Sequence, residues 1–326
     1  MPPRWVRRLV FGAPVRLGMR LHRADRGGGD EVRRHLDGAA DALVAGFDMA
    51  LDDEGAERLA ARLAGLPDLV RGFAHEGAGA ALILLDRYLP ASRSRFETFL
   101  RGPGAPFAVL LHVGAGLALA RVSRHIEDDT RGVDAEMRWM PLDAYGFERA
   151  VFASERVVSG GEVPPLSAYG RRAFDHGLGR GLWFRTATGL ERIRRTIAGL
   201  APERHADIWS GVGLATAYAG PNTEASLAAL DEAARPHGAS VRLGIACAAY
   251  MRSEGRNPSP HTERAARVLC AMPGEQAADE ARRIQQHLYA HADEAVRANP
   301  YEAFRVALQA AVAGAAAPRQ DLSQRV

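Results

Sequence analysis

A segment of twelve residues that ends at Phe184 carries the densest mixture of groups able to do chemistry. Asp175, His176 and Arg180 lie within six residues of one another, beside two aromatic side chains. A carboxylate, an imidazole and a guanidinium could act on a ligand as acid and base, while the rings hold its apolar part. The alternative is structural: the glycines here would form a helix C-cap and a turn, with Asp175 paired to Arg180. The sequence leaves both interpretations open.

Two short motifs resemble zinc sites but lack required ligands. His75-Glu76 begins like a zinc-protease motif, yet Gly79 stands where the second histidine belongs. His261-Thr262-Glu263 resembles the His-x-Glu of zinc deaminases, yet no Pro-Cys-x-x-Cys follows. We therefore predict no metal site. Residues 261–263 are instead expected to begin a helix, where an acidic residue in the first turn is favourable.

The chain has two cysteines, Cys247 and Cys270, in segments predicted to be buried helices. No disulfide framework is implied, and a reducing compartment is expected. Cys247 could serve as a nucleophile beside a histidine, but a small thiol on an alanine-rich helix usually only packs. No Gly-x-Ser-x-Gly motif is present.

Three Gly-x-Gly steps, at Gly77, Gly114 and Gly211, run into apolar helices. A phosphate-binding loop would need a preceding strand and further residues that are absent. The favoured interpretation is close packing of helices at small residues. If the same glycines face inward, they would instead shape a narrow apolar channel.

The elements that must position these groups are predicted to be helices. Alanine, leucine, arginine and glutamate dominate, whereas valine, isoleucine and threonine are sparse. We predict an all-α, predominantly helical protein of antiparallel helix pairs, either a helical bundle or α-solenoid-like. A shift of 134 residues aligns Glu57-Arg58-Leu59 with Glu191-Arg192-Ile193, and Gly77-x-Gly79 with Gly211-x-Gly213. This alignment indicates a tandem duplication of helical units.

The predicted organisation has four parts, and the stretch from 145 to 184 is the most irregular. They are a basic N-terminal arm (1–29), a first helical repeat half (30–160), a second (161–310) and a disordered tail (311–326).

Charge and hydropathy narrow the function classes. All 42 basic side chains are arginine and the net charge is only +3, so no nucleic-acid partner is predicted. The arginine-rich arm is expected to pack on its own domain or a partner, with peripheral membrane contact as the second option. The N-terminus lacks a signal-peptide pattern, so we expect a cytoplasmic protein. The apolar stretch 102–120 contains prolines and glycines and is expected to be a buried helix.

Six segments, in order over about residues 40–290, resemble a bacterial family, domain-of-unknown-function family 1702, whose members are commonly labelled enediyne biosynthesis proteins. They are Arg71-Gly72-Phe73-x-x-Glu76-Gly77, Gly102-Pro103-Gly104-Ala105-Pro106 with His112-Val113-Gly114-Ala115-Gly116, Asp143-x-Tyr145-Gly146-Phe147, Arg172-Ala173-Phe174-Asp175-x-Gly177-Leu178-Gly179-Arg180-x-Leu182-Trp183-Phe184, Asp207-x-Trp209-Ser210-Gly211-Val212-Gly213-Leu214-Ala215 and His261-Thr262-Glu263. Three residues depart from the family pattern: Phe107 replaces a histidine, Leu117 a tryptophan and His176 a glutamine.

The resemblance implies a role in forming an enediyne polyketide core, downstream of a synthase that releases a linear conjugated polyene. Such a ligand has almost no polar handle and needs an extended apolar cavity. The polar candidates for catalysis are Glu76, His112, Asp143, Tyr145, Asp175, His176, Arg180, Asp207, His261 and Glu263. The candidates for the cavity wall are Gly77, Gly114, Gly116, Trp183, Phe184, Trp209, Gly211 and Gly213.

Three hypotheses follow. The protein binds a polyene or polyyne intermediate and modifies it or presents it to another enediyne biosynthetic enzyme. Alternatively, it is a noncatalytic helical-repeat scaffold for synthase or tailoring enzymes, which predicts an exposed apolar groove. A third hypothesis is a hydrolase or transferase with Cys247 or a serine as nucleophile, within reach of a histidine. No cofactor is indicated by any motif.

Overall fold

The computed structural model describes residues 3–12, 30–52, 55–89, 95–130, 133–152, 157, 165–186 and 189–316. Over these residues the protein is helical and has no strand, which confirms the all-α prediction. The long helices are α3 (Asp30–Leu51), α5 (Asp68–Tyr88), α7 (Ala108–Val122), α9 (Met140–Phe152), α11 (Ala168–Arg185), α13 (His205–Ala219), α15 (Gly238–Glu254), α17 (Gly274–Ala290) and α19 (Pro300–Ala316).

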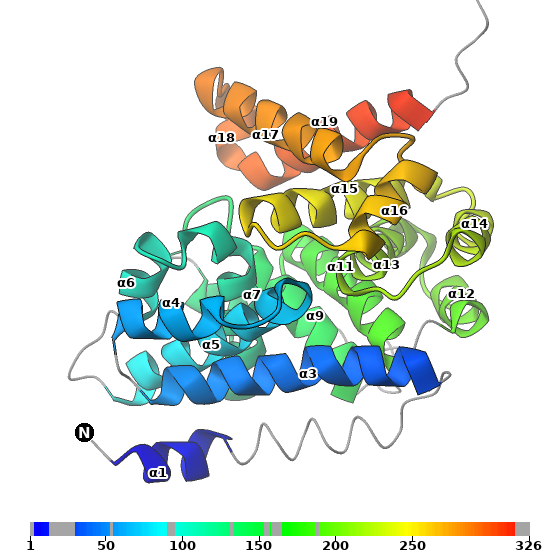
Figure 1. The fold of residues 1–326 in the computed structure, drawn as a ribbon. Coiled ribbons are helices and arrows are strands. Elements are labelled where there is room, and N and C mark those ends of the chain that lie inside the picture. The colour runs from blue at the N-terminus through cyan, green and yellow to red at the C-terminus, as the bar shows by residue number, and fades with distance from the viewer. Residues whose placement is uncertain are drawn as a thin grey trace, which may run out of the picture.

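Shorter helices connect and flank the long ones. They are α1 (Arg4–Arg7), η1 (Arg8–Gly12), α4 (Ala56–Ala64), α6 (Arg95–Arg101), η3 (Ala105–Phe107), α8 (Ile126–Asp129), α12 (Leu190–Ala198), η4 (Pro202–Arg204), α14 (Glu224–Ala233), α16 (Pro260–Leu269) and α18 (Glu294–Ala298). Each long helix from α3 to α15 packs against the next one along the chain. Figure 1 shows the stack rising from α1 and α3 to α17 and α19, with α12 and α14 at one edge.

The Gly-x-Gly steps are the points where neighbouring helices touch through their backbones. A Cβ atom on Gly77 would lie 1.9 Å from the carbonyl oxygen of Leu43 on α3, and one on Gly79 would lie 2.3 Å from that of Leu111 on α7. The two glycines of one step therefore serve opposite neighbours. This confirms the prediction of close packing at small residues.

The same contacts recur further along the chain. A Cβ on Gly211 would lie 1.9 Å from the carbonyl oxygen of His176 on α11, and one on Gly213 would lie 2.3 Å from that of Val241 on α15. The contacts made by Gly77 and Gly79 thus recur between residues 130 to 134 positions further along the chain. This offset is close to the shift of 134 residues found in the sequence. Helices α4 (56–64) and α12 (190–198) are offset by 134 residues as well.

Two sequence predictions about local structure were wrong. The glycine-rich segment 173–184 lies inside the continuous helix α11, whose N-cap Ser167 accepts a hydrogen bond from the backbone N–H of Gly170. Packing of these glycines against α9 and α13 outweighs their low helix propensity. Helix α19 continues to Ala316 with Val312 fully buried, so the expected tail is helical from 311 to 316. Residues 317–326 lie outside the described part.

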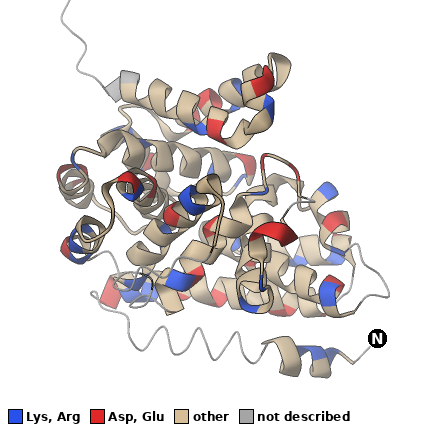
Figure 2. Cartoon of the chain, turned by 180° about the vertical axis from the view of Figure 1, so that it is seen from behind, with Lys and Arg blue, Asp and Glu red and all other residues tan. Residues whose placement is uncertain are grey.

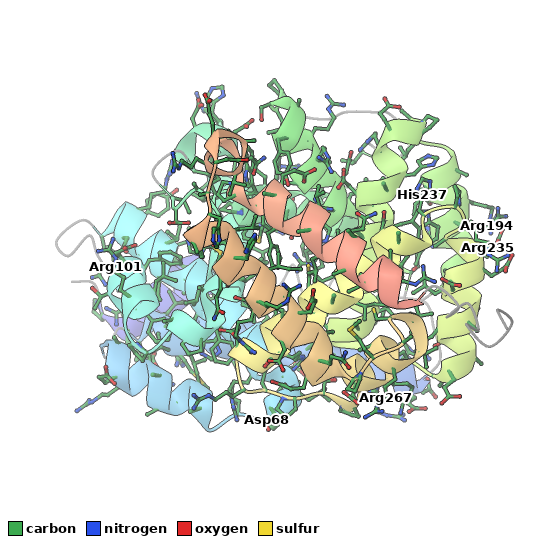
Figure 3. All side chains as sticks on the ribbon, turned by 90° about the horizontal axis from the view of Figure 1, so that it is seen from above. Asp68, Arg101, Arg194, Arg235, His237 and Arg267 are labelled. Carbon is green, nitrogen blue, oxygen red and sulfur yellow. The ribbon has the colours of Figure 1, made fainter. Side chains whose placement is uncertain are left out.

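Basic and acidic side chains are both present on the outer surface. Figure 2 shows arginine and acidic residues interspersed over the visible face. Exposed pairs such as Arg194 with Glu191 and Arg235 with Glu232 lie on and beside α12 and α14, and both arginines stand at the rim of the view from above in Figure 3. Among the described residues one stretch, Ala105–Val122, is long and apolar enough to cross a membrane, and 56% of it is buried inside the fold.

Candidate functional site

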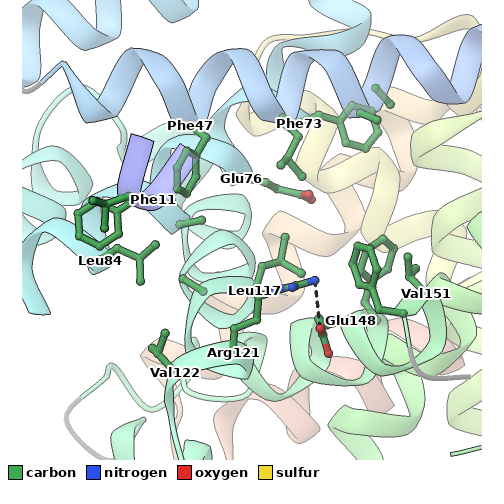
Figure 4. A pocket seen from close by; sticks show the side chains of 18 of the residues that line it. Phe11, Phe47, Phe73, Glu76, Leu84, Leu117, Arg121, Val122, Glu148 and Val151 are labelled. Carbon is green, nitrogen blue, oxygen red and sulfur yellow. Dashed lines mark ion pairs between the residues drawn. The ribbon is translucent and has the colours of Figure 1, made fainter. Parts of the chain in front are cut away.

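A cavity of about 610 Å³ lies between α3, α5, α7, α9 and α11, with α1 and η1 forming part of its wall (Figure 4). Its surface is mainly aliphatic and aromatic. The lining side chains include Leu36, Ala39, Ala40, Leu43, Phe47, Phe73, Ala80, Leu84, Leu117, Ala118, Phe147, Val151, Phe152 and Phe184. The same helices that contact one another through glycines therefore also enclose this space.

A buried cluster of four charged or titratable side chains begins at the wall of the cavity. Arg180 and Glu76 both line the cavity, and an Nη of Arg180 lies 3.6 Å from Oε1 of Glu76. Behind them, Arg180 donates to one carboxylate oxygen of Asp143. Nδ1 of His176 lies 2.5 Å from the other oxygen of Asp143. All four side chains are buried, and they come from α5, α9 and α11.

Helix packing sets the geometry of this cluster. Gly177 brings α11 so close to α9 that a Cβ there would lie 1.7 Å from the carbonyl oxygen of Asp143. His176 is the preceding residue on α11, and Arg180 follows it by four residues, so both share one face of the helix. The short approach of the two backbones thus places both side chains at the carboxylate of Asp143.

Burial and neighbouring charges separate the pKa values of the two carboxyl groups. Burial raises the pKa of Glu76 to about 7; Arg180 opposes this rise and Asp143 adds to it. Burial also raises the pKa of Asp143, but Arg180 and His176 outweigh that effect, so its pKa lies below the usual value. Glu76 can therefore carry a proton near neutral pH, while Asp143 stays ionised and orients His176 and Arg180. Two carboxyls with opposite shifts are typical of acid–base pairs.

A smaller cavity of about 60 Å³ lies on the other side of the cluster. Asp143, His176 and Arg180 line it together with Cys247 and Tyr301. Burial raises the pKa of Cys247 to about 11, so the thiol is protonated at neutral pH and is a poor nucleophile. This protonation state weakens the hypothesis of a hydrolase built on Cys247.

Two other predicted carboxylates lie in separate ion pairs. Asp175 accepts hydrogen bonds from Nε of Arg204, 3.0 Å from each of its oxygens. The interpretation in which Asp175 pairs with Arg180 is therefore wrong, because the two side chains leave α11 on different faces. Asp207 on α13 pairs with Arg172, at 2.9 Å, and with Arg305, at 2.8 Å, where it ties α13 to α11 and α19.

The remaining predicted polar residues serve local packing or helix ends. Nδ1 of His112 lies 2.8 Å from the carbonyl oxygen of Ala108 one turn earlier in α7. Tyr145 packs its ring edge-on against Phe174. His261 meets the ring of His35 edge-on. Glu263 lies in the first turn of α16 and accepts a hydrogen bond of 2.7 Å from the backbone N–H of Gly274. The prediction that 261–263 begin a helix is confirmed.

The predicted wall residues divide in the same way. Phe184 lines the cavity, whereas Trp183 and Trp209 lie in the hydrophobic core. The five glycines proposed for the wall pack against backbone atoms of neighbouring helices and do not line either cavity described above: Gly77, Gly114, Gly116, Gly211 and Gly213. The channel interpretation of these glycines is not supported.

The three departures from the family pattern have clear places. Leu117 lines the large cavity and His176 belongs to the charge cluster. Phe107 stacks on the ring of His75 with 3.6 Å between ring centroids, at the side of α5 away from the cavity. Two of the three changes therefore lie at the site.

Sequence reasoning missed several residues of the site. Glu148 and Arg121 line the cavity and lie 3.3 Å apart as an ion pair (Figure 4). Phe47, Phe73 and Phe147 are three of the aromatic side chains in its wall. Helical spacing offered a signal, because cavity residues repeat at intervals of three or four along α5 and α11. Among the described residues, no group of three or more His, Cys, Asp or Glu side chains is arranged to hold a metal ion.

The fold and the site together define an all-α protein with an apolar, ligand-sized cavity that ends at a buried charge cluster. The chain belongs to the family described as "Protein of unknown function (DUF1702)", whose pattern matches residues 4–312. No curated protein and no solved structure gives a significant match to the chain.

Proposed function

We propose that the protein binds a linear, apolar, conjugated molecule in the large cavity and acts as an accessory protein in the formation of an enediyne polyketide core. The observation that carries the proposal is the cavity itself. Its volume of about 610 Å³ falls within the usual range for small-molecule sites, and its wall is dominated by aliphatic and aromatic side chains. The enediyne assignment rests on the family resemblance given above.

The charge cluster gives the cavity one reactive wall. Glu76, with a pKa of about 7, can donate a hydrogen bond or a proton to a ligand atom beside it. Arg180 lies next to Glu76 and is held by Asp143, so a polar end of the ligand would be oriented there. This arrangement supports modification of the ligand as well as binding. His176 acts as a positioning residue because it holds Asp143.

Filling the cavity tests the proposal directly. Ala40→Phe and Ala118→Phe add a ring at two points of the wall, on α3 and α7. Titration of the purified protein with a linear conjugated polyene, followed by its absorbance, should show at least about tenfold weaker binding for each variant, because the added ring occupies the space of the ligand. Ala228→Phe adds the same bulk on the exposed face of α14 and should bind like the wild type.

A second experiment tests the biosynthetic role. The protein is purified from a strain that makes the polyene, and co-purifying molecules are identified by mass spectrometry. We expect a polyene-derived ligand, and changed enediyne products when the gene is deleted. Recovery of biosynthetic enzymes without any ligand, together with undiminished polyene binding by the filled variants, would favour the scaffold hypothesis. Unchanged products after deletion and no ligand would refute the proposal.

A further inference from the structure

An apolar patch is exposed on the short helical segments at the N-terminus. The side chains of Trp5, Leu9 and Val10 are 68%, 62% and 55% exposed. Tyr88, 49% exposed, extends the patch because its ring stacks on Phe11 with 5.8 Å between centroids. The other large hydrophobic side chains that are exposed in the described part of the chain lie on α16, α17 and α19. The N-terminal corner is therefore the place where such residues gather.

Arginine side chains gather at Asp52, on the same helical segments as this patch. Asp52 at the end of α3 contacts the guanidinium groups of Arg4, Arg8 and Arg62 at distances of 2.7 to 3.0 Å. Arg7 donates to the backbone carbonyl of Asp52 at 2.7 Å. Three guanidinium groups thus meet at the buried carboxylate of Asp52, and a fourth reaches its backbone carbonyl. The side chain of Arg4 remains 55% exposed. The contacts fix α1 and η1 on α3 with basic groups beside the exposed rings.

The opposite face of the same segment forms part of the cavity wall. Val6, Arg7, Val10 and Phe11 line the large cavity. Val10 belongs to both the cavity wall and the exposed patch, since it lines the cavity and is more than half exposed. Only one layer of chain therefore separates the apolar cavity from the apolar patch outside.

We propose that α1, η1 and Tyr88 form a docking surface for an anionic lipid bilayer. A tryptophan beside aliphatic side chains inserts favourably at the boundary between headgroups and acyl chains, and arginines pair with lipid phosphates. Weak apolar insertion becomes stable binding when basic residues supply a second attraction. A stable protein interface buries roughly 800 Å² per partner, with about twenty residues a side, which is far more than this patch of four side chains offers.

Docking on a bilayer would let an apolar ligand enter the cavity from the lipid phase as well as from water. A molecule with little solubility in water concentrates in the acyl region, and the wall formed by η1 would face that region directly. The surface is defined without reference to any ligand, so this inference stands independently of the proposed function.

Vesicle sedimentation tests the proposal with the full chain. Vesicles that contain phosphatidylglycerol should bind the wild type, and phosphatidylcholine vesicles should bind it less. The double variant Trp5→Ser/Leu9→Ser removes two exposed apolar groups that do not line the cavity. Its partition into anionic vesicles should fall at least about tenfold, because the variant loses the transfer free energy of two apolar side chains that the bilayer would otherwise bury. Val268→Ser/Val306→Ser, on exposed sites of α16 and α19, is the matched control.

Several outcomes would overturn the proposal. They are an absence of binding to anionic vesicles, equal binding by the Trp5→Ser/Leu9→Ser variant, and binding that high salt does not weaken. Self-association that this variant abolishes, without vesicle binding, would assign the patch to a protein contact instead. Circular dichroism and polyene titration in solution should be the same for wild type and variant, so failure of this proposal can be distinguished from failure of the cavity assignment.

Discussion

Replacing Glu76 with glutamine should change how the stability of the protein depends on pH. Glu76 is buried beside Arg180, and burial, the largest effect, raises its pKa from 4.5 to about 7. Because each factor of ten in proton affinity corresponds to about 1.4 kcal/mol, this rise is equivalent to about 3 kcal/mol of unfolding free energy. Glutamine keeps the shape and an acceptor for Arg180 but cannot ionise.

Proton linkage gives the sign of this pH dependence. Between about pH 4.5 and pH 7 the folded protein holds a proton on Glu76 that the unfolded chain releases. The contribution of Glu76 to stability is therefore fully present below pH 4.5, is lost progressively as the pH rises, and changes no further above about pH 7. The Glu76→Gln variant should lack this loss. Its unfolding free energy relative to the wild type should increase by about 3 kcal/mol across the window.

Urea unfolding at a series of pH values measures this difference, since contributions from other titrating groups largely cancel between the two proteins. Glu57→Gln on α4 is a control for the loss of one carboxylate. Carbon NMR of the Glu76 carboxyl would report its titration independently. Parallel stability curves for wild type and Glu76→Gln would refute the reasoning, as would a carboxyl that titrates at 4.5 in the folded protein.

Three further predictions concern packing, charge and the thiol. Gly211→Ala should lower the free energy of unfolding by several kcal/mol, because the new Cβ would lie 1.9 Å from the carbonyl oxygen of His176. Gly38→Ala, whose Cβ would have no atom within 4 Å, should instead stabilise α3 by about 0.5–1 kcal/mol. Chemical denaturation compares the two variants. Arg180→Met should destabilise the fold by about 3–5 kcal/mol, because it removes the guanidinium partner of the buried Asp143 carboxylate; restored stability on also neutralising Asp143 would support this cause. Cys247, with a pKa of about 11, should react with iodoacetamide far more slowly than a free thiol at pH 8, and fast alkylation of the folded protein would contradict this raised pKa.

The sequence was sufficient to predict the helical class and the role of the glycines. Helix-forming residues dominate the composition, and each Gly-x-Gly step marks a contact with two neighbours. The continuity of α11 was missed, because glycine lowers local helix propensity and the packing that overrides it comes from other helices, α9 and α13.

Prediction of the site was partial for a similar reason. Glu76, Asp143, His176 and Arg180 were all among the candidates, yet nothing in their spacing indicated that they meet, since they come from three helices. Asp175 and His176 are neighbours in sequence but leave the helix about 100° apart, so one pairs with Arg204 and the other joins the cluster. A single sequence does not specify which face of each helix points toward which neighbour.

The recurrence of the glycine contacts bears on the origin of the charge cluster formed by Glu76, Asp143, His176 and Arg180. At the offsets of 133 and 134 residues that relate Leu43 to His176 and Gly77 to Gly211, Arg180 corresponds to Phe47 and Glu76 to Ser210. The scaffold is repeated, but the charged cluster is not. In a symmetric pair of identical subunits, any acid introduced at one copy would appear at both. Joining the copies in one chain lets one set of equivalent positions become ionisable while the other stays apolar.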